Sequence, residues 1–439
     1  MTAPTANSMT PAMTHEAQPA SAGLPPAMES PILGTYKRAP VEFVRGSGVY
    51  LYDAEGKAYL DFVAGIAVNA LGYDDAGLKA AMHAAADGLI HTSNLYSTSP
   101  GEQLAAALVA KSFADKVFFC NSGAEANEGA FKFARRWART LGDAKHEILA
   151  LRGAFHGRLF ATLAATDRPS YRLPFRPLTP GVSIFERDLR ELDAALNEDT
   201  VAALIVEPVQ GEGGVRVLDP GFLRELRALT KERKVALILD EIQCGLGRTG
   251  TLFAYEQAGI EPDMVTLAKP IAGGLPMGAI LMTNEIAAAV KPGDHGTTFG
   301  GGPFVASVAM HVFERLSDPK LLEHVRTTGA WFGKQLNEIA HRTSRIRQVR
   351  GAGLMWGIDV MGTSAHVVSE ALGRGLLVCS AGDYTVRLLP PLVATADIQK
   401  TTGEQARAAG AQGILNKPVN RDQLALAIQT ILAGGNTWN

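Results

Sequence analysis

Short apolar runs alternate with longer segments of helical spacing between about residues 75 and 315. The runs include VAALIVEP, VALILDE, DMVTLAK and GAILMT, bounded by charged residues, prolines, polar residues or glycines. Continuous apolar runs of this length are typical of strands buried on both faces of a parallel sheet. The pattern therefore predicts an α/β fold built from βα units on a mainly parallel sheet.

The two ends of the chain differ from this central region. Residues 31–75 alternate short β-like runs with turns, and residues 316–395 bring strands back once a long helical stretch, residues 303–344, has ended. We expect these two segments to form a smaller α/β domain and residues 76–315 to form a large one. Residues 1–30 are rich in Ala, Pro, Thr and Met and have neither the basic start nor the apolar block of a secretory signal, which predicts a disordered tail.

Composition narrows the class of protein. The 439 residues are 46% hydrophobic and 20% charged, which indicates a globular protein of two or three domains. A formal net charge of −2 and the lack of a 20-residue apolar segment give no reason to expect a nucleic-acid or membrane partner. Three scattered cysteines, without a CxxC pair, predict free thiols in the cytoplasm and no metal site.

One helix start is a candidate anion site. Ser122 and Glu125 have the spacing of a capping box, placed after the apolar run KVFFC. Either this is an ordinary capped helix, or the segment from Ser122 through Gly123 to Ala124 presents backbone N–H groups and a hydroxyl to a phosphate. Apolar residues then recur at helical spacing: Ala126, Ala130, Ala134, Trp137 and Leu141.

A second candidate site begins where VALILDE ends, at Asp240. A magnesium-binding strand of a P-loop ATPase would also end this way, but GxxxxGK[ST] does not occur in the chain. The alternative partner for the carboxylate is a cationic ring nitrogen. Lys269 ends the next apolar run, and neighbouring parallel strands bring their C-terminal ends to one crevice. A lysine, an aspartate and a phosphate-binding helix start together predict pyridoxal 5'-phosphate as the cofactor.

Eight ordered motifs support this interpretation: HTSNLY, NSGAEANEGAFKFAR, AFHGR, EPVQGEGG, ILDEIQCGLGRTG, LAKPIAGGLPMGA, HGTTFGG and RLLPPL. With them the chain resembles the class III, fold type I pyridoxal-phosphate aminotransferases, most closely the acetylornithine aminotransferases. The similarity runs from about residue 31 to about residue 395.

The resemblance implies roles around the cofactor. Lys269 would bind it covalently and then move a proton as general base and acid, while Asp240 would pair with the pyridine nitrogen. Thr298 would reach the phosphate from the second subunit, which implies an obligatory homodimer. The remaining contacts would be Gln243 at the phenolic oxygen, Phe155 and Ile242 on the two ring faces, and Ser122, Gly123 and Ala124 at the phosphate.

The resemblance also implies the reaction, in which the terminal amine of N-acetylornithine passes to 2-oxoglutarate in arginine biosynthesis. Succinylornithine, ornithine and 4-aminobutyrate are alternative donors. Glutamate has a carboxylate beside its reacting carbon, whereas a donor that reacts through a terminal amine has none. An arginine that binds this carboxylate therefore needs a protein carboxylate to neutralise it in the half-reaction with the terminal amine. Glu207 and Arg387 match the family's residues for this gating pair. Arg158 would bind the far carboxylate, and Thr297 would line the substrate pocket.

Residues 396–439 depart from the family and resemble the last third of a response-regulator receiver domain, ending in GAQGIL, Lys417-Pro418 and a final helix. We expect that this fragment cannot be phosphorylated as a receiver. The fragment either substitutes structurally for the family's final helix or results from a gene-fusion or assembly artefact. A separate alternative function is a non-catalytic scaffold in which the receiver-like tail is the interacting part. The joint presence of Lys269, Asp240, Arg158 and Arg387 argues against a scaffold, which would have no use for all four.

Overall fold

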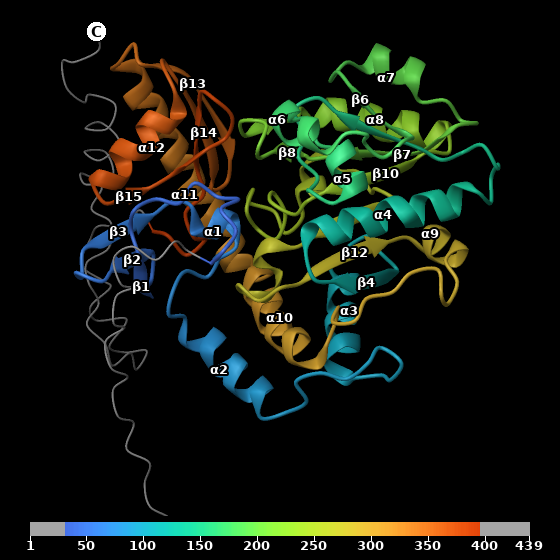
Figure 1. Ribbon diagram of the computed structural model, residues 1–439, viewed down its shortest axis with the longest axis horizontal. Helices are drawn as coiled ribbons and strands as arrows, with labels where there is room; N and C mark the ends of the chain where they lie inside the picture. Colours follow the sequence, from blue (N-terminus) through green and yellow to red (C-terminus); the bar gives the residue numbers. More distant parts are fainter. Residues whose placement is uncertain (1–30, 396–439) are drawn as a thin grey trace, which may run out of the picture. The chain divides into compact units, whose positions relative to one another are not determined.

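The computed structural model describes residues 31–395 (Figure 1). The predicted tail at residues 1–30 and the receiver-like fragment at 396–439 lie outside these residues. Residues 31–42 contain neither helix nor strand, and the first strand begins at Phe43. None of the described helices is long and apolar enough to cross a membrane.

A seven-stranded sheet forms the larger part of the fold, in the order β4-β12-β11-β10-β7-β5-β6. Strand β12 runs antiparallel to both of its neighbours, and the pairs from β11 to β6 are all parallel. The prediction of a mainly parallel α/β sheet is therefore confirmed. The strands are β4 (Lys116–Cys120), β5 (Glu147–Leu151), β6 (Val182–Phe185), β7 (Val201–Val206), β10 (Ala236–Asp240), β11 (Met264–Leu267) and β12 (Gly278–Met282).

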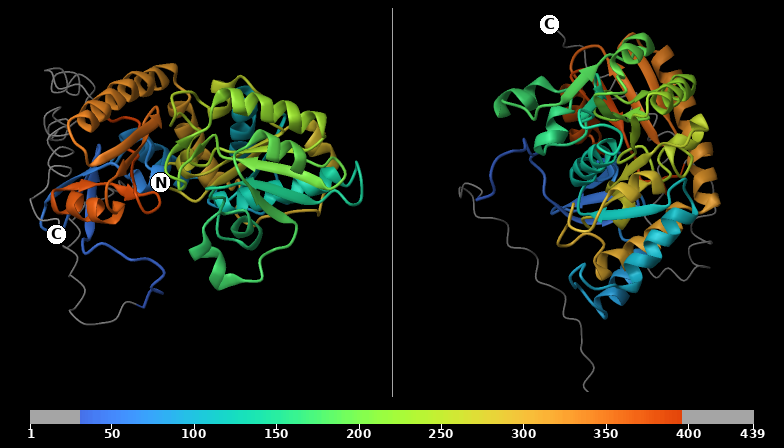
Figure 2. Two further views of the ribbon diagram at one scale, coloured as in Figure 1. Left: turned by 90° about the horizontal axis from the view of Figure 1, so that it is seen from above. Right: turned by 90° about the vertical axis from the view of Figure 1, so that its right-hand side faces the viewer.

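The central strands are buried on both faces, and alternate residues serve different cores. In β10, Leu237 and Leu239 pack into one apolar cluster, whereas Ala236 and Ile238 pack into another. Helices cover both sides of the sheet (Figures 1 and 2). Alternate residues of a strand point to the same face, so the side chain of Asp240 lies on the same face as those of Ala236 and Ile238. This face is covered by α4 (Gly123–Ala138).

Helix α4 largely follows its predicted pattern. Ser122 caps the helix by accepting a hydrogen bond from the Glu125 N–H (3.2 Å), while the Glu125 carboxylate accepts from the Asn121 N–H (2.9 Å). The first four residues of the predicted apolar stripe are buried against the sheet. The prediction for Leu141 is wrong: the helix ends at Ala138, and Leu141 is 46% exposed.

The opposite face of the sheet packs against α3 (Ser99–Ala110), α8 (Pro220–Glu232) and α10 (Pro303–Leu316). The long helical stretch expected after residue 303 is two helices, because Pro319 starts α11 (Pro319–His341) with Asp318 as its cap. Shorter elements are α1 (Ala64–Ala67), α2 (Ala76–Ala86), α5 (Phe160–Ala164), α6 (Pro169–Arg172), η1 (Leu173–Phe175), α7 (Leu189–Ala195), β8 (Val209–Gln210), β9 (Arg216–Val217), η2 (Ala254–Ala258), η3 (Lys269–Ala272) and α9 (Asn284–Ala289).

Two smaller sheets use the segments on either side of this region. One, ordered β13-β14-β17-β16, is antiparallel and packs against α11. The other is ordered β1-β2-β3-β15, so that early strands and a late strand share one sheet. The elements are β1 (Phe43–Ser47), β2 (Tyr50–Asp53), β3 (Ala58–Asp61), β13 (Ile346–Ala352), β14 (Met355–Val360), α12 (Ser364–Gly373), β15 (Leu376–Leu377), β16 (Cys379–Ser380) and β17 (Thr385–Leu388).

Candidate active site

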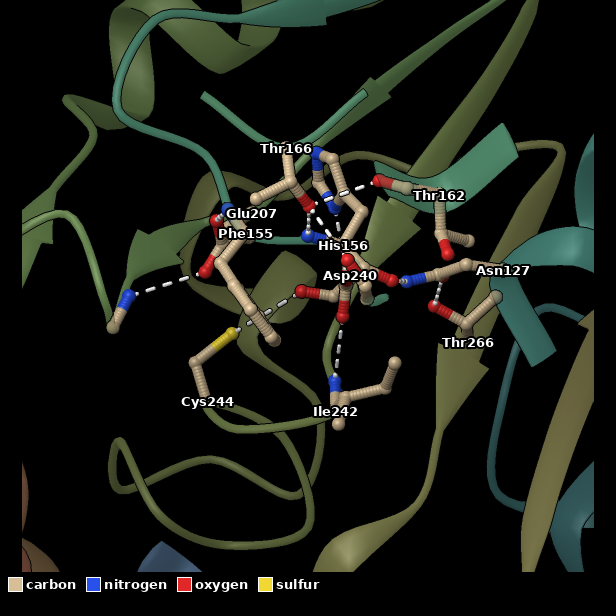
Figure 3. A network of polar contacts seen from close by, with 12 residues as sticks. Asn127, Phe155, His156, Thr162, Thr166, Glu207, Asp240, Ile242, Cys244 and Thr266 are labelled. Atoms are coloured by element: carbon tan, nitrogen blue, oxygen red, sulfur yellow. Dashed lines mark hydrogen bonds and ion pairs between the residues drawn. The ribbon is translucent and has the colours of Figure 1, made fainter. Parts of the chain in front are cut away.

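Asp240 ends strand β10 as a buried carboxylate that accepts three hydrogen bonds (Figure 3). Its Oδ2 accepts hydrogen bonds from Asn127 Nδ2 and from His156 Nδ1, both at 2.8 Å. Its Oδ1 accepts from the Ile242 N–H at 3.1 Å. These contacts fix the orientation of the carboxylate from three separate segments of the chain.

Asn127 and His156 were not predicted as site residues. Asn127 is itself fixed, because it also donates to the His156 carbonyl (2.8 Å) and accepts from the Thr266 hydroxyl (2.7 Å). The signal available in the sequence was weak: an asparagine within the predicted helix, and the histidine after Phe155. Their importance depends on the position of Asp240, which lies more than eighty residues away from either.

Lys269 follows strand β11 and starts the short helix η3. Its backbone has a φ of 44°, a left-handed conformation that costs a non-glycine residue about 1–3 kcal/mol and is concentrated at functional sites. Burial lowers the pKa of its amine, while the charge of Asp240 opposes that shift. The structure thus brings the predicted lysine and aspartate into one electrostatic environment, and it favours an amine that loses its proton more easily than usual.

The start of α4 supplies the third part of the site. The first N–H groups of a helix have no partner within the helix, and Gly123 and Ala124 are only partly buried. A β-carbon at Gly123 would lie 2.8 Å from Ile242 Cδ1, so only glycine allows this turn to approach the Ile242 side chain. A helix start of the kind that binds anions therefore lies beside Ile242, two residues after Asp240.

Gln243 and Arg387 form the next layer of contacts. Arg387, on β17, is 1% exposed; its Nη1 donates to Gln243 Oε1 at 2.9 Å and pairs with Glu212 Oε1 at 2.7 Å. Burial by itself lowers the pKa of Arg387, but Cys379 and Glu212 raise it overall, so the guanidinium is charged. With its Oε1 occupied, Gln243 keeps its amide N–H groups for another acceptor.

The predicted pairing of Glu207 with Arg387 is wrong. Glu207 accepts hydrogen bonds from the Phe155 N–H (2.8 Å) and the Gly211 N–H (3.1 Å), and its burial raises its carboxyl pKa to about 7. Strand β7 ends at Val206, and the β8–β9 turn that follows carries Glu212, rather than Glu207, to Arg387. Glu207 instead holds the backbone of Phe155.

The remaining predicted residues lie at the edges of the site. Phe155 is partly buried and meets Tyr171 edge-on, with ring centroids 6.4 Å apart. Arg158 is exposed and lies over the face of Tyr171. Thr297 Oγ1 accepts from Asn121 Nδ2 at 3.2 Å, next to the start of α4, while Thr298 is exposed. No group of side chains within residues 31–395 has the composition of a metal site.

These residues fit pyridoxal phosphate by the chemistry of their donors and acceptors. Within residues 31–395 no lysine or arginine pairs with Asp240, and its histidine contact is the hydrogen bond with His156, so the carboxylate would suit a cationic ring nitrogen. Lys269 would provide an amine for the cofactor's aldehyde, and Gly123 and Ala124 would provide N–H groups for its phosphate. The fold and the site define the class of protein as a pyridoxal-phosphate-dependent enzyme of fold type I.

Comparison with known proteins identifies the family. Aminotransferase class-III matches residues 34–408, and the chain belongs to this family, whose members use pyridoxal phosphate. The chain is 45% identical over 367 residues to the acetylornithine aminotransferase of Methanocaldococcus jannaschii, covering 82% of this chain and 91% of the relative. It is 46% identical over 374 residues to that of Gloeobacter violaceus, covering 84% and 93%.

Solved structures agree with this assignment. The ornithine aminotransferase of Toxoplasma gondii superimposes with a TM-score of 0.83 at 29% identity, covering 92% of each chain. The N-acetylornithine aminotransferase of Stenotrophomonas maltophilia gives 0.75 at 34% identity, covering 91% of this chain and 98% of its own. Family membership supports the predicted enzyme and not the alternative of a non-catalytic scaffold.

We expect Lys269 to be the covalent attachment point. Borohydride reduction of the holoenzyme should fix the cofactor to the wild-type chain, and intact-mass spectrometry should show the added mass. Lys269→Ala should show none, because its side chain has no amine. Lys234→Ala is the matched control and should behave as wild type. A cofactor adduct on another lysine in the Lys269→Ala chain would contradict the assignment.

Proposed function

We propose that this chain transfers the terminal amino group of N-acetylornithine to 2-oxoglutarate, giving glutamate and N-acetylglutamate semialdehyde in arginine biosynthesis. The observation that carries the proposal is the Glu212–Arg387 pair, a buried arginine with a carboxylate that can be exchanged. The sequence relatives support the choice of donor, because those compared above are acetylornithine aminotransferases.

The pair accommodates two donors that differ in charge. Glutamate carries a carboxylate next to its reacting carbon, which can replace Glu212 on the Arg387 guanidinium. A terminal amine has no such group, so Glu212 must stay and neutralise the arginine, whose charge cannot be removed by deprotonation. Arg158, at the exposed edge of the site, would bind the far carboxylate of either substrate.

The other side chains hold and move protons. Bound pyridoxal phosphate supplies an electron-withdrawing ring that stabilises charge on the substrate carbon. Asp240, fixed by Asn127 and His156, would keep the ring nitrogen protonated. The Lys269 amine, with its pKa lowered by burial, would take a proton from the substrate carbon and return one.

We also infer that the enzyme works as a homodimer in the cytoplasm. Asn94 Nδ2 donates to the carbonyls of Thr297 (3.1 Å) and Gly300 (3.2 Å), and this ties two loops together. Exposed apolar side chains on these loops favour a contact with a second copy, and Thr298 lies among them. The exposed residues are Leu89, Ile90, Leu95, Tyr96 and Phe299. All three cysteines are free, which suits the cytoplasm.

A donor panel tests the proposed substrate. We expect kcat/KM for N-acetylornithine to exceed that for ornithine, and for 4-aminobutyrate, by about tenfold or more, as a pocket that recognises the acyl amide requires. Succinylornithine should fall between these values. Equal or higher kcat/KM for unacylated ornithine would overturn the choice of donor while leaving the aminotransferase assignment intact.

The two glutamates should behave differently when neutralised. Glu212→Gln frees the Arg387 charge, so glutarate should bind the holoenzyme about tenfold more tightly, while the terminal-amine half-reaction should slow about tenfold. Glu207→Gln is the matched control and should leave the ratio of the two half-reaction rates unchanged. Stopped-flow measurement gives the rates of the two half-reactions. A larger change in their ratio for Glu207→Gln than for Glu212→Gln would support the predicted pairing of Glu207 with Arg387.

Subunit complementation tests the homodimer. Lys269→Ala and Thr298→Glu chains should each be inactive, the second because its carboxylate repels the phosphate of the opposite subunit. Co-expressed chains should recover about a quarter of wild-type activity, since half of the dimers are mixed and each has one intact site. Sedimentation velocity checks the assembly. A monomer, or a mixture without activity, would contradict the shared site.

A further inference from the structure

The ring of Tyr171 connects two residues of the candidate site. Tyr171 lies on α6, whereas Phe155 and Arg158 lie in the loop between β5 and α5. The Arg158 guanidinium carbon is 3.8 Å from the centroid of the Tyr171 ring, which is a face-on cation–π contact. The same ring meets Phe155 edge-on, at 84° between the ring planes.

This contact holds Arg158 without using its donors. Within residues 31–395 the guanidinium has no ion pair with a carboxylate, although the side chain is exposed. An unrestrained arginine loses rotamer freedom when it binds a ligand. Stacking on the Tyr171 ring restricts the Arg158 side chain before a ligand binds, so less conformational entropy is lost on binding. The N–H groups in the guanidinium plane stay available for a carboxylate.

We propose that Tyr171 is a positioning residue that holds Arg158 ready to bind the far carboxylate of the substrate. The inference rests on the proposed role of Arg158. Since Tyr171 also contacts Phe155, it fixes the arginine relative to the side chain proposed to stack on the cofactor ring. Tyr171 therefore sets the distance between the bound carboxylate and the reacting carbon, which selects substrates by chain length.

Variants of Tyr171 in the holoenzyme test this role. Tyr171→Phe keeps the aromatic face and should keep KM within about twofold of wild type. Tyr171→Leu removes the face and should raise KM for both N-acetylornithine and 2-oxoglutarate about threefold to tenfold, with kcat changed less than about twofold. Glutarate affinity by calorimetry should fall by the same factor. Tyr171→Met is a second apolar variant for use if Tyr171→Leu does not fold.

A donor without a carboxylate separates positioning from general damage. The amine half-reaction with pentylamine should proceed at the same rate in wild type and Tyr171→Leu, because pentylamine offers nothing for Arg158 to bind. Slowing of this reaction together with the others would show that Tyr171 supports the fold of the site, and would overturn the proposal.

Arg158 variants distinguish a failure of the positioning role of Tyr171 from a failure of the carboxylate-binding role of Arg158. If Tyr171 acts through Arg158, the double variant Tyr171→Leu/Arg158→Ala should match Arg158→Ala alone. If Arg158→Ala raises KM and Tyr171→Leu does not, the inference about Tyr171 fails and the role of Arg158 stands. If Arg158→Ala leaves KM unchanged, the proposed role of Arg158 fails, and the positioning role of Tyr171 fails with it.

Discussion

The structure depends on a buried negative charge, the carboxylate of Asp240. An ionised carboxylate is costly to remove from water unless hydrogen bonds and a positive partner compensate for it. Here a helix side chain, a histidine from another loop and a backbone N–H supply the hydrogen bonds. Strand β10, helix α4 and the segment after β5 must therefore keep their relative positions. That requirement fixes where the proposed cationic partner of Asp240 would have to lie.

Lys269 and Arg387 are both basic side chains buried in the same region of the protein. Burial and the charge of Arg387 lower the lysine pKa, whereas Asp240 and Glu212 raise it. An amine that loses its proton easily can attack an aldehyde and accept a proton, as catalysis requires. Glu212 pairs with Arg387 and also raises the pKa of Lys269. In the proposed reaction a substrate carboxylate would displace Glu212, so one negative charge would replace another and the charge balance around Lys269 would be conserved.

Features that depend on neighbours along the chain could be predicted from the sequence. The apolar runs identified most strands of the central sheet but not β6, and the Ser122 cap identified the start of α4. The same local rules failed where a helix ended earlier than the apolar spacing predicted. Leu141 continued the apolar spacing but lies beyond the end of the helix, and Pro319 divided a stretch that looked continuous. Spacing records which face a residue would occupy, but not whether the helix reaches it.

The sequence by itself determined the α/β class, the buried parallel strands and the residues at their C-terminal ends, because strand burial and helix capping act over a few positions. Only the tertiary structure decided which partners those residues meet. Glu207 and Glu212 lie in one motif and carry the same charge, and a two-stranded turn determines which of them reaches Arg387. Asn127, His156 and Tyr171 likewise gain their roles through contacts between separate elements. Such contacts form when distant segments pack together, and residue spacing along the chain carries no record of them.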